Sequence, residues 1–166
     1  MAPASTSNLT DPAMTTTVLN TPPDLTPNEQ RIAALATSLA RELAPGAAEH
    51  DRTGAFALHH HQRLHEAGYL RLALPRDHGG DGASLFEMVL AQERLAQGDA
   101  ATAVGVGMLL NVIGKAREEP SWPEPVFAQV CQTLAREGGL VNSVVTEPDL
   151  GSISRGGVPA TTATRV

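Results

Sequence analysis

The chain has 166 residues and a formal net charge of −6, with 18 acidic against 12 basic side chains. Neutralisation of phosphates dominates the affinity of proteins for nucleic acid, so this acidic chain, with a single lysine, is not expected to bind it. Hydrophobic residues make up 42% of the sequence and aromatic residues 3%, which indicates a folded protein with a core of mostly Ala, Leu and Val.

The single cysteine, Cys131, excludes a disulfide within the chain and fits a reducing compartment. No positively charged segment precedes an apolar run near the N-terminus, so we predict no secretory signal. The longest nearly apolar run, residues 100–113, is too short to span a bilayer. We therefore expect a cytoplasmic protein without a membrane partner.

Residues 1–26 contain no Lys or Arg and are rich in Thr and Pro. We predict a disordered tail, because so little apolar surface cannot offset the entropy of ordering. The first helix is predicted to begin at Thr26, with Glu29 completing a capping box, and to end at Pro45-Gly46. Its apolar stripe at helical spacing consists of Ile32, Leu35, Ala36, Leu39 and Leu43.

A second helix is predicted over 56–67, ended by Gly68, and a capping box of Ser84 and Glu87 begins a third. The predicted buried face of the third helix consists of Leu85, Met88, Val89, Leu95 and Ala96. Between them, the glycines of residues 79–82 fit neither dinucleotide-binding template, so we predict a tight structural loop.

Asp99 is predicted to cap a fourth helix. Because residues 100–113 are apolar on every side, we expect this helix to be buried in the middle of a bundle. Its Gly105 and Gly107 leave room for a neighbour or a ligand. Phe127, Val130, Cys131 and Leu134 define a last helix, which is predicted to end at Gly138-Gly139.

After Gly139 the hydrophobic period changes, and residues 140–145 and 158–166 are predicted strands. Between them, Pro148 favours an extended Glu147, and Gly151 allows a close approach of a ligand to the backbone. Ser152 offers a hydroxyl and an N–H that suit a phosphate or carbonyl oxygen. The predicted fold is mostly α: a tail (1–26), a helical bundle (27–138), and the first strands of an incomplete β-domain (139–166), since two strands alone are marginal in water.

The histidines of the second helix are a candidate metal site, which the sequence disfavours. No acidic or Cys partner stands at zincin spacing, and three consecutive histidines cannot share one helix face. We therefore predict a solvated surface patch and no metal site. The residues concerned are His59, His60, His61 and His65.

The run VTEPDLGS (145–152), followed by SRGGVPATTAT, resembles the flavin-binding segment of the acyl-CoA dehydrogenase family. HDR (50–52), EAGYLRLALPRDHGGDG (66–82) and LAQGDAATA (95–103) resemble that family's helical domain. The resemblance covers residues 28–166, and the family's proteins are considerably longer. It implies that Ser143, Val144, Val145 and Thr146 lie at the isoalloxazine ring of FAD. It also implies that Gly151 and Ser152 lie near its phosphates, with Ser152 next to the substrate.

The resemblance implies an FAD-dependent oxidoreductase that acts on CH–CH bonds of acyl-CoA thioesters, and it allows a homo-oligomer. In the members of that family a carboxylate takes a proton from Cα while hydride passes from Cβ to the flavin. In the family this carboxylate lies in a C-terminal helical domain, so no catalytic residue is assigned here and the chain alone is expected to be inactive. Ile153 stands where many members have an acid, which leaves the substrate class open.

Two alternatives are open. A flavin-dependent monooxygenase has the same fold but uses reduced flavin and oxygen. A non-enzymatic helical module would offer the apolar surfaces of residues 100–113 and 140–145 to a partner chain, since exposed strand edges favour association.

Overall fold

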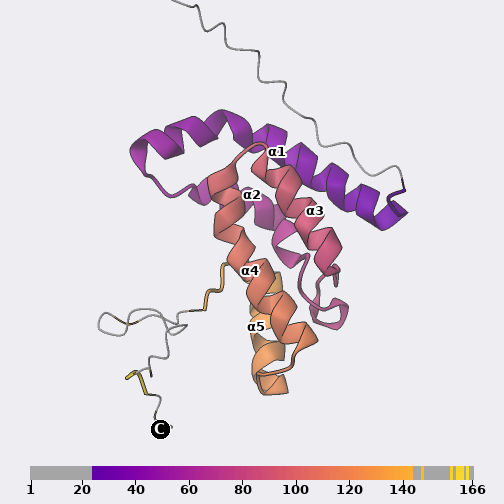
Figure 1. The fold of residues 1–166 in the computed structure, drawn as a ribbon, viewed down its shortest axis with the longest axis vertical. Helices are drawn as coiled ribbons and strands as arrows, with labels where there is room; N and C mark the ends of the chain where they lie inside the picture. Colours follow the sequence, from indigo (N-terminus) through magenta and orange to yellow (C-terminus); the bar gives the residue numbers. More distant parts are fainter. Residues whose placement is uncertain (1–23, 144–146, 148–157, 159, 163, 165–166) are drawn as a thin grey trace, which may run out of the picture.

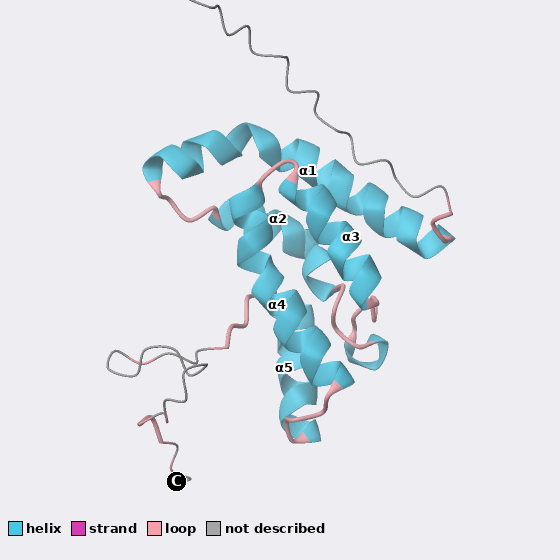
Figure 2. Cartoon of the chain, viewed as in Figure 1, coloured by secondary structure: helices cyan, strands magenta, loops and turns pink. Residues whose placement is uncertain are grey.

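The computed structural model describes residues 24–143, 147, 158, 160–162 and 164 (Figure 1). These residues form helices joined by short connections, and none of them lies in a strand (Figure 2). α1 packs along α3, and α3 packs along α4. The helical elements are α1 (Pro27–Thr53), α2 (Leu58–Glu66), α3 (Leu85–Ala96), α4 (Ala100–Glu118) and α5 (Glu124–Glu137), with 3-10 turns η1 (Tyr69–Arg71) and η2 (Arg76–His78).

The beginning of α1 is as predicted, but its end is not. The Thr26 hydroxyl accepts a hydrogen bond from the Glu29 N–H, and the Glu29 carboxylate accepts one from the Thr26 N–H. The helix then continues through Pro45 and ends at Gly54, where φ is 66°. The predicted end at Pro45-Gly46 is wrong. A proline inside a helix removes only one backbone hydrogen bond, and beyond Gly46 the good helix formers Ala47, Ala48 and Glu49 continue the helix.

The loop between η1 and α3 is the predicted tight structural loop. A Cβ at Gly80 would collide with the carbonyl oxygen of Leu74. The Arg117 guanidinium of α4 donates hydrogen bonds to the carbonyl oxygens of Ala73 (3.2 Å) and Ala83 (2.6 Å), at the two ends of the loop. The loop is thereby fixed to α4.

The predicted buried face of α3 is correct for Met88 and Leu95 and wrong for Leu85 and Val89, which are 63% and 58% exposed. α3 has apolar residues on two adjacent stripes, and only the stripe that faces α1 and the core is covered. The two-stripe pattern alone does not say which stripe is covered.

The prediction that residues 100–113 are buried all round is wrong as well. Asp99 caps α4 as predicted, and Val106, Leu109 and Ile113 are fully buried. On the opposite side of α4, Val104 is 75% exposed. α4 therefore lies at the edge of the described bundle.

The hydrophobic core joins all of the helices and both ends of the η1–α3 loop. It also includes Cys131 of α5, whose thiol pKa burial raises to about 11. The principal members of the core are Ile32, Leu39, Leu64, Tyr69, Leu72, Leu74, Leu95, Val106, Leu109, Ile113 and Cys131.

Among the described helices, none is long and apolar enough to cross a membrane.

α5 ends at Gly138, where φ is 68°, as predicted. Residues 140–143 belong to the first predicted strand, and the structure shows no strand there. The same holds for residues 158, 160–162 and 164 of the second. A strand requires a neighbouring strand for its backbone hydrogen bonds, and the described residues supply none. The other positions of both predicted strands lie outside the described residues.

The predicted solvated histidine patch is wrong for two of its four members. His60 is 1% exposed and His61 is 9% exposed, whereas His59 is exposed. α2 packs with one face inwards, and His60 finds a polar partner in Asp99 at the beginning of α4. A buried polar group is tolerated when it is hydrogen-bonded, and this partner is distant in sequence.

Candidate functional site

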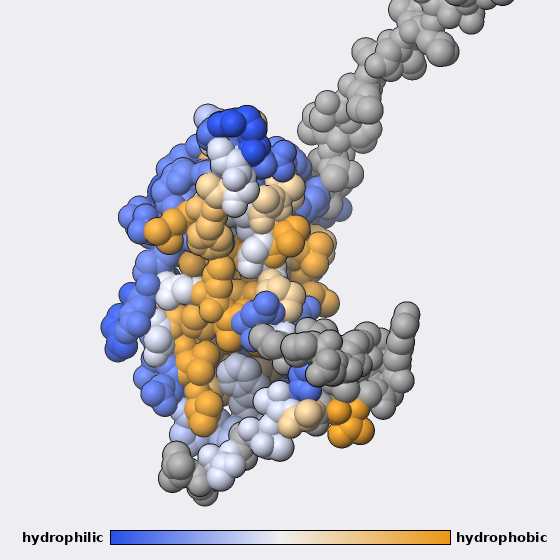
Figure 3. Space-filling view, turned by 90° about the vertical axis from the view of Figure 1, so that its left-hand side faces the viewer, coloured by the Kyte–Doolittle hydropathy of each residue, from blue (hydrophilic) through white to orange (hydrophobic). Residues whose placement is uncertain are grey.

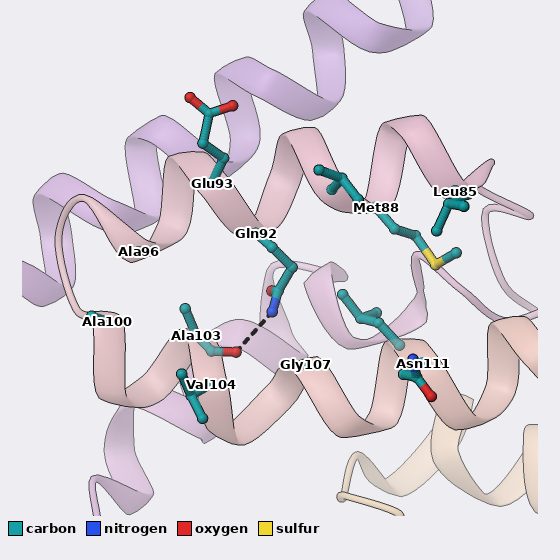
Figure 4. A pocket seen from close by; sticks show the side chains of 12 residues that line it. Leu85, Met88, Gln92, Glu93, Ala96, Ala100, Ala103, Val104, Gly107 and Asn111 are labelled. Atoms are coloured by element: carbon teal, nitrogen blue, oxygen red, sulfur yellow. Dashed lines mark hydrogen bonds between the residues drawn. The ribbon is translucent and has the colours of Figure 1, made fainter. Parts of the chain in front are cut away.

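A groove of about 530 Å³ lies between α3 and α4, and we call it the α3–α4 groove (Figure 4). Most of its lining side chains are apolar or small, which suits a hydrocarbon ligand or an apolar protein surface. Glu93 also belongs to the lining, and its carboxylate points away from α4 in Figure 4, with Oε1 buried and hydrogen-bonded to no described residue. The lining residues are Leu85, Met88, Val89, Gln92, Glu93, Ala96, Ala100, Ala103, Val104, Gly107, Leu110 and Asn111.

Gln92 is held in a fixed orientation across the groove. Its amide nitrogen donates a hydrogen bond of 2.8 Å to the carbonyl oxygen of Ala103 on α4 (Figure 4). Its amide oxygen accepts one of 2.6 Å from the buried hydroxyl of Tyr69. Gly107 leaves the space for this amide, because a Cβ there would lie 3.0 Å from Gln92 Nε2. The Gln92 amide is therefore satisfied within the protein.

Exposed apolar side chains continue from the groove over the molecular surface. Phe86 of α3 is 50% exposed and Met108 of α4 is 40% exposed, in addition to Leu85, Val89 and Val104. Figure 3, in which the left-hand side of Figure 1 faces the viewer, shows a broad band of apolar residues. Large contiguous apolar patches are uncommon on proteins that act without a partner or ligand, so these surfaces are candidate contact sites.

A second cavity, of about 470 Å³, lies where α5 leads into the predicted flavin segment, and we call it the junction cavity. Phe56 stacks on His61 there, with ring centroids 4.7 Å apart and an interplanar angle of 4°. Burial lowers the pKa of His61, and the adjacent His60 lowers it further. The lining residues are Phe56, Leu58, His61, Gln62, His65, Leu70, Glu137, Gly138, Gly139 and Leu140.

Two imidazole nitrogens at this cavity are buried without a partner. They are Nδ1 of His61 and Nδ1 of His65, and no described residue hydrogen-bonds to either. A buried polar atom without a partner costs free energy, which a hydrogen bond to a ligand would remove. The junction cavity therefore combines apolar walls with two imidazole nitrogens to which no described residue hydrogen-bonds.

The predicted flavin-binding residues lie largely outside the described residues. This applies to Val144, Val145, Thr146, Gly151 and Ser152. Ser143 is described, is exposed, and its N–H donates a hydrogen bond of 2.7 Å to the Asn142 side chain. Leu140, which begins the same segment, lines the junction cavity.

Glu147 is a residue of this segment to which the sequence assigned only a place in the turn. Its carboxylate accepts hydrogen bonds from the N–H groups of Ala160 (2.8 Å) and Thr161 (2.7 Å). Hydrogen bonds from the side chain of Thr161, and then from these two N–H groups, lower its pKa. Glu147 thus connects the predicted turn to the second predicted strand, and only the tertiary structure identifies its partners.

The sequence singled out the α4 side of the groove in part, with Gly107 as room for a ligand and residues 100–113 as a surface for a partner chain, but it did not predict the α3 side as a site. The available signal was the second apolar stripe of α3 together with an α4 that is apolar on all sides, because two such neighbouring helices leave apolar surface uncovered.

Comparisons with known proteins agree with this architecture. The chain is 46% identical over 127 residues to "Putative acyl-CoA dehydrogenase YdbM" of Bacillus subtilis (strain 168), an alignment that covers 76% of this chain and 33% of that protein. It is 31% identical over 130 residues to the 3-sulfinopropanoyl-CoA desulfinase of Paraburkholderia xenovorans (strain LB400), covering 78% of this chain and 33% of that protein.

Among solved structures, the nitrososynthase from Micromonospora carbonacea var. africana is similar, with a TM-score of 0.61 and 25% identity over 70% of this chain and 31% of that chain. The present chain thus spans about a third of the length of these relatives. Residues 26–117 match the model of the acyl-CoA dehydrogenase N-terminal domain. With this match over more than half of its length, the chain belongs to the acyl-CoA dehydrogenase family.

Proposed function

We propose that this chain is the helical part of an FAD-dependent oxidoreductase that acts on the CH–CH bond of acyl-CoA thioesters. The observation that carries the proposal is the continuity of the chain: the family-matched helices lead directly into the segment 143–152, which resembles the family's flavin-binding segment. In this proposal residues 27–138 form the helical domain, residues 139–166 begin the β-domain, and residues 1–26 are a tail.

Ser143, Val144, Val145 and Thr146 are the residues that we assign to the isoalloxazine ring, with Gly151 and Ser152 at the phosphates. The described neighbours fit such a group, because Ser143 is exposed and the junction cavity offers unpartnered imidazole nitrogens. When bound, FAD supplies the ring that accepts a hydride. In this assignment the chain forms hydrogen bonds to the edge of the isoalloxazine ring. Gly151 has no side chain and so lets the phosphates approach the backbone.

We assign the α3–α4 groove to the acyl chain of the substrate. Its volume of about 530 Å³ and apolar lining suit a hydrocarbon tail, and the fixed Gln92 amide presents no unsatisfied polar group to it. Ser152 is assigned to the thioester end. We assign no catalytic base to residues 1–166, so the chain alone is expected to show no dehydrogenase turnover.

The test is a chimera in which this chain replaces the matching third of the 46% identical Bacillus subtilis relative, with the intact relative as the control. We expect a yellow protein with one FAD per chain, whose flavin absorbance is bleached by acyl-CoA without oxygen. A folded, colourless chimera beside a yellow parent would refute the proposal.

Variants of the chimera separate the assigned roles. Thr146→Val with Ser152→Ala is expected to weaken FAD binding about tenfold or more, through two lost hydrogen bonds of about 1 kcal/mol each. Val89→Asp is expected to raise KM for long-chain acyl-CoA without changing FAD content, because a charge in the groove opposes a hydrocarbon chain. Loss of FAD in the Val89→Asp variant would count against the groove assignment.

A flavin-dependent monooxygenase is the second candidate, favoured by the likeness to a nitrososynthase structure. The chimera does not distinguish the two, because its remaining two thirds come from the relative. The distinguishing feature is a carboxylate placed to take the Cα proton, which a dehydrogenase needs and a monooxygenase does not.

A further inference from the structure

Three histidines from two helices meet where the end of α1 lies beside α2. His50 comes from α1, and His59 and His60 come from α2. One ring nitrogen of each lies within 4.8 Å of the corresponding nitrogens of the other two. The ring centroids are 4.2 Å apart for His59 and His60, and 4.7 Å apart for His50 and His60. We call these residues the three-histidine cluster.

His60 is oriented by a buried carboxylate. Its Nδ1 lies 2.7 Å from Asp99 Oδ2, and the two side chains are 2% and 4% exposed. Asp99 itself is fixed as the cap of α4, because its carboxylate accepts hydrogen bonds from the N–H and the hydroxyl of Thr102. With Nδ1 directed to Asp99, Nε2 is the nitrogen of His60 that can bind a ligand. A carboxylate behind a histidine is the usual outer partner of a metal-ligating imidazole.

Among the described residues, neither of the other two histidines has a hydrogen-bond partner that would prevent ligation. Nδ1 of His50 is buried and hydrogen-bonded to no described residue, and His59 is exposed. Gly46 makes room for the rings, since a Cβ there would lie 2.9 Å from His60 Nε2. The nearby cavity of about 430 Å³, which His59 and His60 line, gives access from solvent.

We propose that the three-histidine cluster binds a divalent first-row transition-metal ion, with Zn²⁺ as the reference ion, through one nitrogen of each imidazole and a solvent molecule in the fourth position. Bonds of about 2.0–2.1 Å in a tetrahedral site place the nitrogens about 3.4 Å apart. The rings therefore close inwards by about an ångström, which the exposed His59 and the half-buried His50 permit by side-chain rotation.

Such an ion would act as a clamp between α1 and α2. Residues 44–54, which form the end of α1 and its cap, are all exposed or half-buried. Apolar burial therefore does little to hold this part of α1, and a metal bridge through His50 would hold it to α2. The predicted consequence is a metal-dependent gain in thermal stability.

The experiment uses the full chain without a histidine tag, freed of metal by a chelator. Titration with ZnCl₂ by calorimetry is expected to give one ion per chain, and CoCl₂ is expected to give the visible absorption of a four-coordinate site. His50→Ala and His59→Ala should each weaken Zn²⁺ binding about tenfold or more and abolish the Zn²⁺-induced rise in Tm. Asp99→Asn should weaken it by about 10- to 100-fold, as removal of such an outer partner does elsewhere.

The matched controls are His65→Ala and His78→Ala, which lie outside the cluster and should bind Zn²⁺ as tightly as the parent. Because His59 is exposed, His59→Ala is expected to fold like the parent. Circular dichroism verifies the fold of each variant. Unchanged binding in both His50→Ala and His59→Ala, or loss of binding in His65→Ala, would overturn the proposal. Neither result depends on FAD or acyl-CoA.

Discussion

The hydroxyl of Tyr69 donates a hydrogen bond of 2.6 Å to the amide oxygen of Gln92. Tyr69 belongs to η1 and is completely buried, and burial raises the pKa of its hydroxyl, which stays protonated as a donor. Since the Gln92 amide nitrogen continues to Ala103, one chain of hydrogen bonds joins η1, α3 and α4. This chain fixes the floor of the α3–α4 groove.

Tyr69→Phe keeps the ring and removes the donor. We expect the free energy of unfolding to fall by about 1–2 kcal/mol, because the Gln92 oxygen is left without its partner. Urea denaturation measures the loss. In a double-mutant cycle with Gln92→Met, the Tyr69→Phe step should become nearly neutral, and an equal loss in both backgrounds would show that the hydrogen bond is not its cause.

Gly98→Ala tests the contact between the α3–α4 turn and α1. A Cβ at Gly98 would collide with the carbonyl group of Ala40, which is backbone and cannot rotate away. We expect a loss of about 3 kcal/mol or more, at the upper end of overpacking effects. Gly54→Ala is the control: its φ of 66° makes alanine strained, but no atom lies within 4 Å, so about 1–2 kcal/mol is expected. Equal losses would contradict a steric role for Gly98.

Alanine substitutions of two leucines compare the contribution of the core to stability with that of the α3–α4 groove. Leu109 of α4 is completely buried, and Leu109→Ala should cost about 2–5 kcal/mol through lost burial and a cavity. Leu85 is 63% exposed at the groove, and Leu85→Ala should change stability by less than about 0.5 kcal/mol. Thermal unfolding of both variants compares them directly. A large loss from Leu85→Ala would mean that this stripe of α3 belongs to the core.

Glu87 carries a pH-dependent contribution to stability. Burial opposes its ionisation, but hydrogen bonds from Ser84 and Asn28 and the charge of Arg31 outweigh burial and lower its pKa. A carboxyl with a lowered folded-state pKa contributes stability that is present above its unfolded pKa and is lost as pH falls through the folded value.

Glu87→Gln should therefore lower the free energy of unfolding at neutral pH by about 0.5–1.5 kcal/mol and make stability less sensitive to acid between about pH 5 and pH 3. Urea denaturation across this range measures both effects. Glu118→Gln, at an exposed position near the end of α4, is the control and should keep the acid sensitivity of the parent. If the free energy of unfolding of Glu87→Gln depends on pH as that of the parent does, Glu87 is not a source of the acid sensitivity.

The sequence alone determined much of the local structure. Thr26 with Glu29, and Ser84 with Glu87, form the capping boxes that the spacing predicted, and Gly138 ends α5. These features depend on residues a few positions apart, so the chain specifies them without knowledge of the fold. The family resemblance was likewise carried by local motifs, and the family is confirmed.

The tertiary structure decided which apolar stripes are covered and which distant polar groups meet. Val89 and Val104 are as apolar as core residues, yet they line a groove because the described part of the chain has nothing packed over them. His60 looked like part of a solvated patch, and its partner Asp99 stands 39 residues away. Burial and long-range pairing are properties of how helices pack against each other, so no local pattern in the sequence could determine them.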